Sequence, residues 1–316
     1  MGASLDVSVV VATVGRATRL AFLLEALQQQ TLPRERYEVV VVRGRLPGDP
    51  DGAFEELGAR VIECSPAGPG ALRNKGIAEA RAPLIAFTDD DCRPGAEWLE
   101  RFVEAAAGQN GNFMLQGRTE PDPDERPRLY GLARSQTIVG PSGWYETCNM
   151  AYPRELLERL GGFDERFDGG GEDTDLALRA VAQGASFTYV DDACVWHAVH
   201  SRHLWEALRD QARWQTIPLV IASHAEQRRA LGAGVFWRAG HPRILLAAGA
   251  VLATRRAGPL ALAAAVPYVR YHVHGYDRTV RGLARAALDL PPRALVDLAG
   301  VVTTVRAAIR HRTAVV

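Results

Sequence analysis

The chain has 316 residues, enough for one large domain with an appendage or for two modest domains. Its hydrophobic content of 47% and charged content of 23% are typical of a globular protein and exclude a chain that is disordered throughout. The formal net charge of zero hides an asymmetry, because residues 226–316 carry 14 Arg and 4 acidic residues whereas residues 1–225 have an acidic excess, so we expect two regions of different character.

Alternating strands and helices are predicted along the first ninety residues. Buried apolar runs predict strands, and helical periodicity predicts helices between them. The strands are expected at 7–12, 38–42, 60–63 and 84–88, and the helices at 18–29 and 71–80. This order is typical of an α/β nucleotide-binding fold with a mainly parallel central sheet. Ligands of such sheets bind beyond the carboxyl ends of the strands, so a site is expected after residues 12, 42 and 88.

Three adjacent carboxylates, Asp89, Asp90 and Asp91, follow the strand expected at 84–88. They repel one another unless a cation neutralises them. Mg²⁺ and Mn²⁺ prefer carboxylate oxygens and commonly bridge to substrate phosphates. We therefore favour a metal site at this point. The alternatives are a solvated acidic turn and an Asp that caps a helix starting near Gly95.

Polar side chains suited to a base or a phosphate accompany the same edge of the expected sheet. Thr13, Gly15 and Arg16 follow the first strand, and Arg73 and Asn74 lie in the helix expected at 71–80. Arginine supplies planar, bidentate contacts to phosphate. These residues are therefore candidates for contact with a nucleotide, although any one of them could be a surface group.

A second acidic group follows three glycines at 169–171. Glu172, Asp173 and Asp175 open a helix expected to end at Gly184. Carboxylates at a helix N-terminus are stabilised by the free N–H groups, which is the structural alternative. A general base for a sugar hydroxyl needs an ionised carboxylate, and Asp173 is the candidate, with Glu172 or Asp175 holding the acceptor or completing the cap. His197 follows a strand expected at 190–195, as a packed or a functional histidine.

Four stretches, 7–16, 71–94, 147–167 and 171–179, together resemble the family 2 glycosyltransferases with a GT-A fold. The resemblance covers roughly residues 5–215 and implies a metal-dependent, inverting transfer of a sugar from a nucleotide-sugar donor to an acceptor hydroxyl. It implies a nucleotide-binding sandwich at 1–225, with a donor half at about 1–118 and an acceptor half at about 119–225. The site residues that we infer are donor contacts at Thr13, Arg16, Arg73, Asn74, Asp89 and Asp90, Mn²⁺ or Mg²⁺ ligands at Asp91, Asp89 and His197, catalytic Asp173 and Glu172, and acceptor contacts at Asn149, Trp144 and Asp175.

Two departures from the family pattern limit what the resemblance implies. The family commonly has an Asp at the end of the second strand, where this chain has Arg43, Gly44 and Arg45, so the nucleotide stays open. Processive members carry a QxxRW motif, and the stretch at 211–214 (QARW) is one residue short of it. We expect a helix at an interface there, and a single transfer rather than polymer synthesis.

Residues 226–316 are predicted to be helical and basic. Apolar runs at 244–253 and 259–269, separated by Arg255 and Arg256, are each too short for a membrane span of about 20 residues. An amphipathic region at a membrane surface and a helical bundle against the catalytic domain or a second subunit both fit. In the first case the acceptor is expected to be lipid-linked or a cell-envelope glycan.

Location and competing functions follow from what the sequence lacks. Cys64, Cys92, Cys148 and Cys194 are scattered and no secretory signal is apparent, so we expect a cytoplasmic protein, with the inner face of the cell membrane as its place if the basic region binds lipid. A sugar-nucleotide pyrophosphorylase would normally show a glycine-rich loop after the first strand, and a non-catalytic glycan-binding relic would tend to lose its carboxylates. No GxGxxG motif supports a dehydrogenase, and no aromatic interleaving supports nucleic-acid binding.

Overall fold

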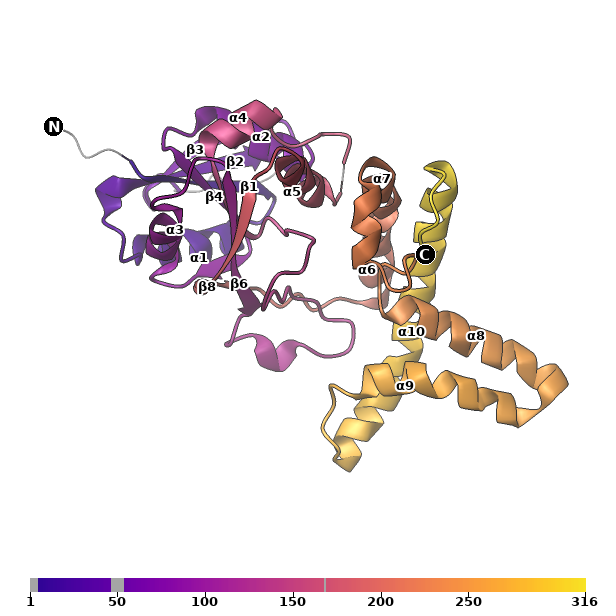
Figure 1. Cartoon of the computed structure of the whole chain (residues 1–316). Coiled ribbons are helices and arrows are strands. Elements are labelled where there is room, and N and C mark those ends of the chain that lie inside the picture. Colours follow the sequence, from indigo (N-terminus) through magenta and orange to yellow (C-terminus); the bar gives the residue numbers. More distant parts are fainter. Residues whose placement is uncertain (1–4, 47–53, 168) are drawn as a thin grey trace. The chain divides into compact units, whose positions relative to one another are not determined.

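The structure is a computed structural model, and it describes residues 5–46, 54–167 and 169–316. The chain forms two compact units, which are described separately below (Figure 1). The first consists of Met1–Pro127 with Ser135–Val199, and the second of Arg128–Arg134 with His200–Val316. This division falls near residue 200, earlier in the chain than the boundary expected at residue 225.

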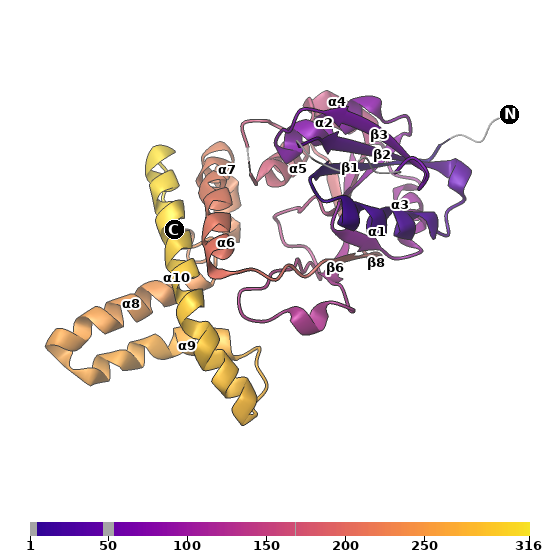
Figure 2. The same ribbon diagram turned by 180° about the vertical axis from the view of Figure 1, so that it is seen from behind.

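An eight-stranded sheet forms the centre of the first unit, in the order β3-β2-β1-β4-β7-β6-β8-β5 (Figure 2). The strands are β1 (Val7–Val14), β2 (Tyr37–Gly44), β3 (Ala59–Cys64), β4 (Leu84–Asp89), β5 (Cys92–Pro94), β6 (Phe113–Pro121), β7 (Asn149–Pro153) and β8 (Ser186–His197). Strands β3, β2, β1 and β4 run parallel, as predicted, and β6 is parallel to β8. The strand β7 is antiparallel to both β4 and β6, and β5 is antiparallel to β8.

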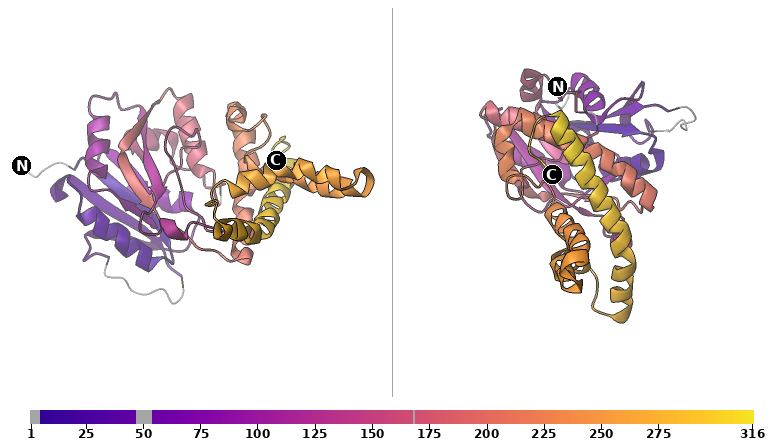
Figure 3. Two further views of the ribbon diagram at one scale, coloured as in Figure 1. Left: turned by 90° about the horizontal axis from the view of Figure 1, so that it is seen from below. Right: turned by 90° about the vertical axis from the view of Figure 1, so that its right-hand side faces the viewer.

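Helices cover both faces of this sheet and explain why β1 has Val or Ala at six of its eight positions (Figure 3). Val9 and Val11 pack in one core cluster with Leu23, whereas Val10 packs in the other with Leu72. Successive side chains of a strand point to opposite faces, so a strand covered on both faces needs an unbroken apolar run. The helices are α1 (Ala17–Gln28) and α3 (Trp98–Ala106) on one face, and α2 (Pro69–Glu79), α4 (Arg154–Leu160) and α5 (Glu172–Ala182) on the other.

The second unit is helical, which confirms the prediction for the C-terminal region. Its elements are α6 (Leu204–Arg209), the 3₁₀ helix η3 (Asp210–Thr216), α7 (Ile217–Ser223), η4 (Ala225–Ala230), α8 (Gly240–Ala257), η5 (Pro259–Ala265), α9 (Val266–Val273) and α10 (Val280–Arg310). A small core joins Ile244, Tyr268 and Val301 from α8, α9 and α10. Among the described residues, no helix combines the length and the apolar character that crossing a membrane requires.

Candidate active site

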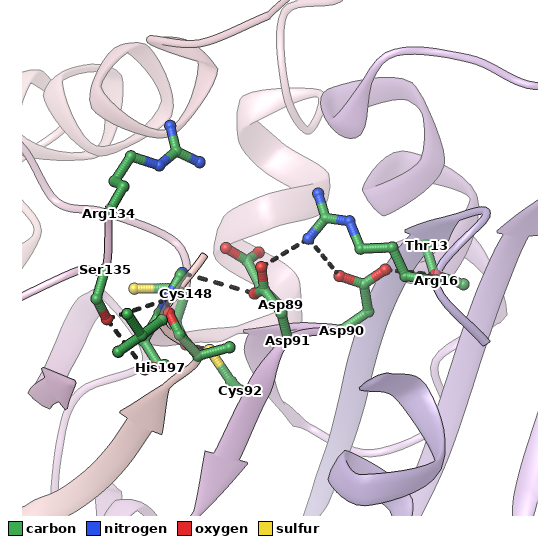
Figure 4. Close-up of polar contacts among 12 residues, drawn as sticks. Thr13, Arg16, Asp89, Asp90, Asp91, Cys92, Arg134, Ser135, Cys148 and His197 are labelled. Atoms are coloured by element: carbon green, nitrogen blue, oxygen red, sulfur yellow. Dashed lines mark hydrogen bonds and ion pairs between the residues drawn. The ribbon is translucent and has the colours of Figure 1, made fainter. Parts of the chain in front are cut away.

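Two of the three carboxylates at the end of β4, Asp90 and Asp91, are held by side chains at the end of β1 and in the turn that follows it (Figure 4). Asp90 accepts hydrogen bonds from Thr13 Oγ1 at 2.5 Å and from Arg16 Nη1 at 2.9 Å. The same Arg16 atom lies 2.6 Å from Asp91 Oδ2. Because β1 and β4 are parallel neighbours, their carboxyl ends meet, which places these four side chains together as the sequence predicted.

The charges at this point are only partly compensated. Burial raises the pKa of Asp90 to about 7, and the nearby Arg16 limits the rise while Asp91 adds to it. Although burial lowers the pKa of Arg16, the surrounding carboxylates raise it by more. A cluster that takes up a proton near neutral pH is one that a cation would stabilise. The alternative of an Asp capping the next helix is wrong, because α3 starts at Trp98 with Glu97 as its N-cap and has no side-chain cap.

Asp91 and His197 form a pair that fits a divalent ion. Strand β5 pairs with β8 so that Cys92 lies opposite His197, and this register leaves His197 Nε2 3.5 Å from Asp91 Oδ1. The other ring nitrogen, Nδ1, lies 2.9 Å from the carbonyl oxygen of Ala198 and 3.5 Å from Ser135 Oγ. When Nδ1 donates its proton to that carbonyl, the Nε2 lone pair faces Asp91, as in metal-binding histidines. A carboxylate oxygen and an imidazole nitrogen are suitable ligands for Mn²⁺.

Glu172 and Asp173 lie in the first turn of α5. Its N-cap is Gly171, whose φ of 89° is in the left-handed region that favours glycine. Asp173 accepts hydrogen bonds from the backbone N–H of Thr174 at 2.8 Å and of Thr147 at 3.4 Å. Burial raises the pKa of Asp173 to about 8, and the neighbouring Glu172 and Glu146 contribute to the rise. Asp173 is therefore a carboxylate that accepts a proton far more readily than an exposed one.

Arg73 joins the two acidic motifs. This buried arginine of α2 lies with Nη1 2.9 Å from Glu172 Oε1 and with Nη2 2.8 Å from Asp89 Oδ1. Burial lowers its pKa, but the two carboxylates outweigh that effect and raise it. The structure thus brings the end of β4 and the start of α5 together around one guanidinium. In this arrangement Arg73 binds two carboxylates of the protein, whereas we expected from the sequence that it would contact the nucleotide.

Replacing Arg73 with glutamine should lower the free energy of unfolding by about 3 kcal/mol, because it leaves Glu172 buried without its counter-charge. Urea unfolding followed by circular dichroism measures this difference. Arg45→Gln is the matched control, since the pair of Arg45 and Glu63 is exposed on both sides and such pairs contribute about 0–1 kcal/mol. Equal losses in the two variants would contradict a stabilising bridge at Arg73.

Three further residues predicted to contact ligands have structural partners instead. Asn74 exchanges hydrogen bonds with the backbone N–H and carbonyl of Phe163. Asn149 is fully buried, accepts from Trp98 Nε1 and donates to two backbone carbonyls. Asp175 is buried and binds Arg179 Nε at 2.8 Å. We therefore do not retain these three as donor or acceptor contacts.

Trp144, the remaining acceptor candidate, is half-buried next to the base. Its carbonyl oxygen accepts a hydrogen bond from Thr174 Oγ1 at 2.6 Å, which ties its loop to the residue after Asp173. Trp144 is partly exposed, so it keeps its place among the proposed acceptor contacts.

Two residues of this site were missed from the sequence. Ser135 faces His197 Nδ1, and its hydroxyl also donates to the His197 carbonyl oxygen at 3.0 Å. Glu146 accepts from Ser142 Oγ at 2.9 Å and from Gln116 Nε2 at 3.2 Å, and its charge raises the pKa of Asp173. No sequence signal marks Ser135, and the only signal for Glu146 is that it directly precedes the stretch 147–167.

Comparison with known families covers most of this unit. Residues 8–161 match the family described as Glycosyl transferase family 2, and residues 128–216 match the one described as Glycosyltransferase like family 2. The chain belongs to the family 2 glycosyltransferases. The predicted family and enzyme class are thereby confirmed.

Curated relatives of this glycosyltransferase share a little over a quarter of its residues. Glycosyltransferase AglE of Haloferax volcanii is 28% identical over an alignment of 222 residues, and the match covers 66% of this chain and 71% of the relative. Validoxylamine A glucosyltransferase of Streptomyces hygroscopicus subsp. jinggangensis is 28% identical over an alignment of 243 residues, and the match covers 62% of this chain and 56% of the relative. The chain thus spans only a little over half the length of the second relative.

Solved structures confirm the GT-A fold. The mannosyltransferase PcManGT from Pyrobaculum calidifontis, in complex with GDP-Man and Mn²⁺, superimposes with a TM-score of 0.56 at 21% identity and covers 98% of this chain and 88% of that one. TarS of S. aureus, residues 1–349 in complex with UDP-GlcNAc, has a TM-score of 0.53 at 16% identity and covers 98% and 93%. Both show the same curled α/β sheet with helices on its faces.

Proposed function

We propose that this glycosyltransferase moves a sugar from a nucleoside-diphosphate donor to an acceptor hydroxyl with inversion at the anomeric carbon. The observation that carries the proposal is the Arg73 bridge, which joins Asp89 of the donor-side motif to Glu172 beside the candidate base Asp173. A transfer reaction needs both substrates at one place, and this bridge holds the two acidic motifs side by side.

The donor is assigned to the edge formed by β1 and β4. Thr13, Arg16 and the Asp89–Asp91 cluster lie there, and the Arg16 side chain is half exposed, so it can turn from the carboxylates towards a phosphate. Mn²⁺ or Mg²⁺ bound by Asp91 and His197, with Asp89 beside them, would stabilise the charge on the leaving diphosphate as a Lewis acid. The similarity to PcManGT, whose structure contains GDP-Man and Mn²⁺, supports this assignment.

The acceptor is assigned to the start of α5. Asp173 removes the proton from the acceptor hydroxyl, whose oxygen forms a bond to the anomeric carbon. The bond between that carbon and the donor phosphate breaks, and its electron pair leaves with the nucleoside diphosphate. Attack opposite to the leaving group inverts the anomeric carbon in one step, so no side chain serves as a nucleophile. Glu172 acts through Arg73, and Trp144 offers an apolar face beside the base.

The decisive assay incubates the protein with a panel of UDP-, GDP- and dTDP-sugars and Mn²⁺, and measures nucleoside diphosphate release. Release from one donor that stops with a chelator would support the proposal and name the nucleotide that Arg43 and Arg45 leave open. A sugar-nucleotide pyrophosphorylase would instead form nucleoside triphosphate from the donor and diphosphate. Donor or glycan binding without any turnover would indicate a binding protein.

The second unit carries a surface suited to anionic lipid. Exposed apolar side chains lie along α8, η5 and α9, including Leu252 at 72% and Leu260 at 86% exposure. Residues 240–276 contain no acidic residue, and Arg255 and Arg256 lie at the end of α8. Apolar side chains combined with arginine are typical of surfaces that lie in the lipid headgroup region. We infer that the enzyme works at the inner face of the cell membrane on a lipid-linked or cell-envelope glycan acceptor.

The protein should sediment with vesicles that contain anionic lipid, and salt should weaken the attachment because it screens the arginines. Replacing both Leu252 and Leu260 with serine should lower the partition coefficient at least tenfold, since burying one leucine contributes about 1.5–3 kcal/mol. Leu288→Ser in α10, also exposed at 77%, is the control. If the wild-type protein stays in the supernatant at low salt, a helical bundle or a dimer contact explains the surface better.

A further inference from the structure

The helical unit contains a cavity of about 190 Å³ that no part of the proposed reaction uses. Every residue that lines it belongs to the second unit. Four of these residues are arginines and only two are carboxylates, namely Arg134, Arg202, Arg238, Arg293, Asp210 and Asp297. The cavity therefore has an excess of positive charge.

Both carboxylates already have partners within the unit. Asp210 Oδ2 lies 2.7 Å from Arg202 Nη1 and 4.0 Å from Arg134 Nη1. Asp297 Oδ2 accepts hydrogen bonds from Tyr268 Oη and His272 Nε2, each at 2.9 Å. Arg134 and Arg202 therefore share the Asp210 carboxylate, and the Asp297 carboxylate binds Tyr268 and His272. Neither carboxylate is within salt-bridge distance of the remaining two arginines.

Arg238 and Arg293 thus form no salt bridge with a carboxylate among the described residues, and Asp297 acts on Arg238 only over a longer distance. The Arg238 guanidinium lies 4.5 Å and 4.6 Å from the ring centres of Trp214 and Trp237, which fix its plane but accept none of its five N–H groups in a conventional hydrogen bond. Arg293 Nη1 donates to His272 Nδ1 at 3.2 Å, while its buried Nε has no hydrogen-bond partner among the described residues. Burial lowers the pKa of Arg238 to about 10, so it stays charged at neutral pH.

We propose that this cavity binds a phosphate or diphosphate group, with Arg238 and Arg293 as its principal ligands. A planar guanidinium matches two phosphate oxygens at once, and an arginine already oriented by stacking loses little freedom when it binds. Gln211 and the backbone of 131–134 complete the lining with neutral polar groups. The group could be a free anion or the phosphate monoester of a lipid headgroup, since both present the same oxygens. The site goes beyond the proposed function, which assigns no ligand to this cavity.

The test measures binding of inorganic diphosphate by calorimetry in the presence of a chelator, which removes the metal-dependent route to the catalytic unit. Arg238→Gln and Arg293→Gln should each weaken binding at least tenfold, and Arg238→Lys should weaken it less than Arg238→Gln because it keeps the charge. Arg213→Gln is the matched control, since Arg213 stacks on the same Trp214 at 4.8 Å but does not line the cavity. A second arm measures binding to vesicles of a neutral phospholipid, prepared with and without added phosphatidic acid.

Weakened diphosphate binding in Arg238→Gln, with Arg213→Gln unchanged, would identify a site for a free anion. The same pattern confined to vesicles with phosphatidic acid would identify a lipid phosphate. No binding in either arm, or an equal loss in Arg213→Gln, would overturn the proposal. Thermal unfolding of each variant shows whether it is folded, and diphosphate should raise the melting temperature of the wild-type protein and of Arg213→Gln more than that of Arg238→Gln or Arg293→Gln. None of these readings depends on sugar transfer.

Discussion

Replacing Asp173 with asparagine is expected to lower the transfer rate roughly 10²–10⁴-fold, the usual effect of removing a general base. Asparagine can accept the same backbone hydrogen bonds from Thr147 and Thr174, so the start of α5 should keep its geometry. It cannot take the proton of the acceptor hydroxyl. Donor and metal binding, measured by calorimetry, should therefore stay unchanged while kcat falls.

The raised pKa of Asp173 gives the same variant a pH signature. The base works only when ionised, so kcat/KM of the wild-type enzyme should rise with pH up to a pKa of about 8, and this limb should be absent in the variant. For stability the sign is opposite. The proton that the folded state holds stabilises it below the ordinary pKa of 3.8, and this contribution is lost as pH rises through about 8. Between these two pH values, the melting temperature of Asp173→Asn should therefore rise relative to that of the wild type as the pH increases.

Asp175→Asn is the matched control for this prediction. It makes the same chemical change in the same helical turn, but Asp175 pairs with Arg179 rather than facing the acceptor. It should lower stability and leave kcat within about tenfold of the wild-type value. Full activity in a folded Asp173→Asn protein would move the base to Glu172, the carboxylate that directly precedes Asp173 in the chain.

The second large effect is expected for Asp91→Ala, which should abolish metal-dependent donor binding. Asp91 supplies the oxygen that faces His197 Nε2, so its removal takes away the carboxylate ligand at this pair. Calorimetric titration of Mn²⁺ and of the donor identified by the nucleotide panel measures the loss. His197→Gln should weaken both affinities in parallel, because the two side chains bind the same ion.

Asp90→Asn separates the metal role from a general effect of removing negative charge. Asp90 bonds Thr13 and Arg16 rather than His197, and asparagine can keep the bond from Thr13. Metal affinity in this variant should therefore fall less than in Asp91→Ala. Unchanged Mn²⁺ and donor affinity in a folded Asp91→Ala protein would rule out the ion site at this pair.

The parallel part of the sheet could be predicted from the sequence because its strands are short-range features. Their apolar runs are nearly continuous, helices follow β1 and β3 within a few residues, and several of the polar residues that matter lie directly after a strand. Thr13, Arg16, Asp90 and Asp91 therefore lie together at one edge of the sheet, as expected, while their roles stay predictions. The place of His197 followed from the family resemblance, and the β5–β8 pairing supplies its physical reason.

The roles of individual polar side chains could not be predicted, because they depend on contacts between distant parts of the chain. Asn149 belongs to β7, which inserts antiparallel between β4 and β6, and only that insertion turns its amide into the core. Arg73 reaches Glu172 across 99 positions of sequence. Amide and guanidinium groups also bind nucleotides, so the residue types and their positions in the sequence favoured a role in ligand binding. Both side chains are instead buried against protein groups, and burial cannot be seen in a local sequence pattern.

The pairing of β5 with β8 has a consequence for how the molecule avoids other chains. Strand β5 is the last strand on its side of the sheet, and an open edge of a sheet is a template on which strands of neighbouring molecules can grow. Here that edge has three residues, carries the charged Arg93 and ends at Pro94, which has no N–H to offer. The strand that positions the proposed metal ligands is thus also too short and too interrupted to recruit another chain.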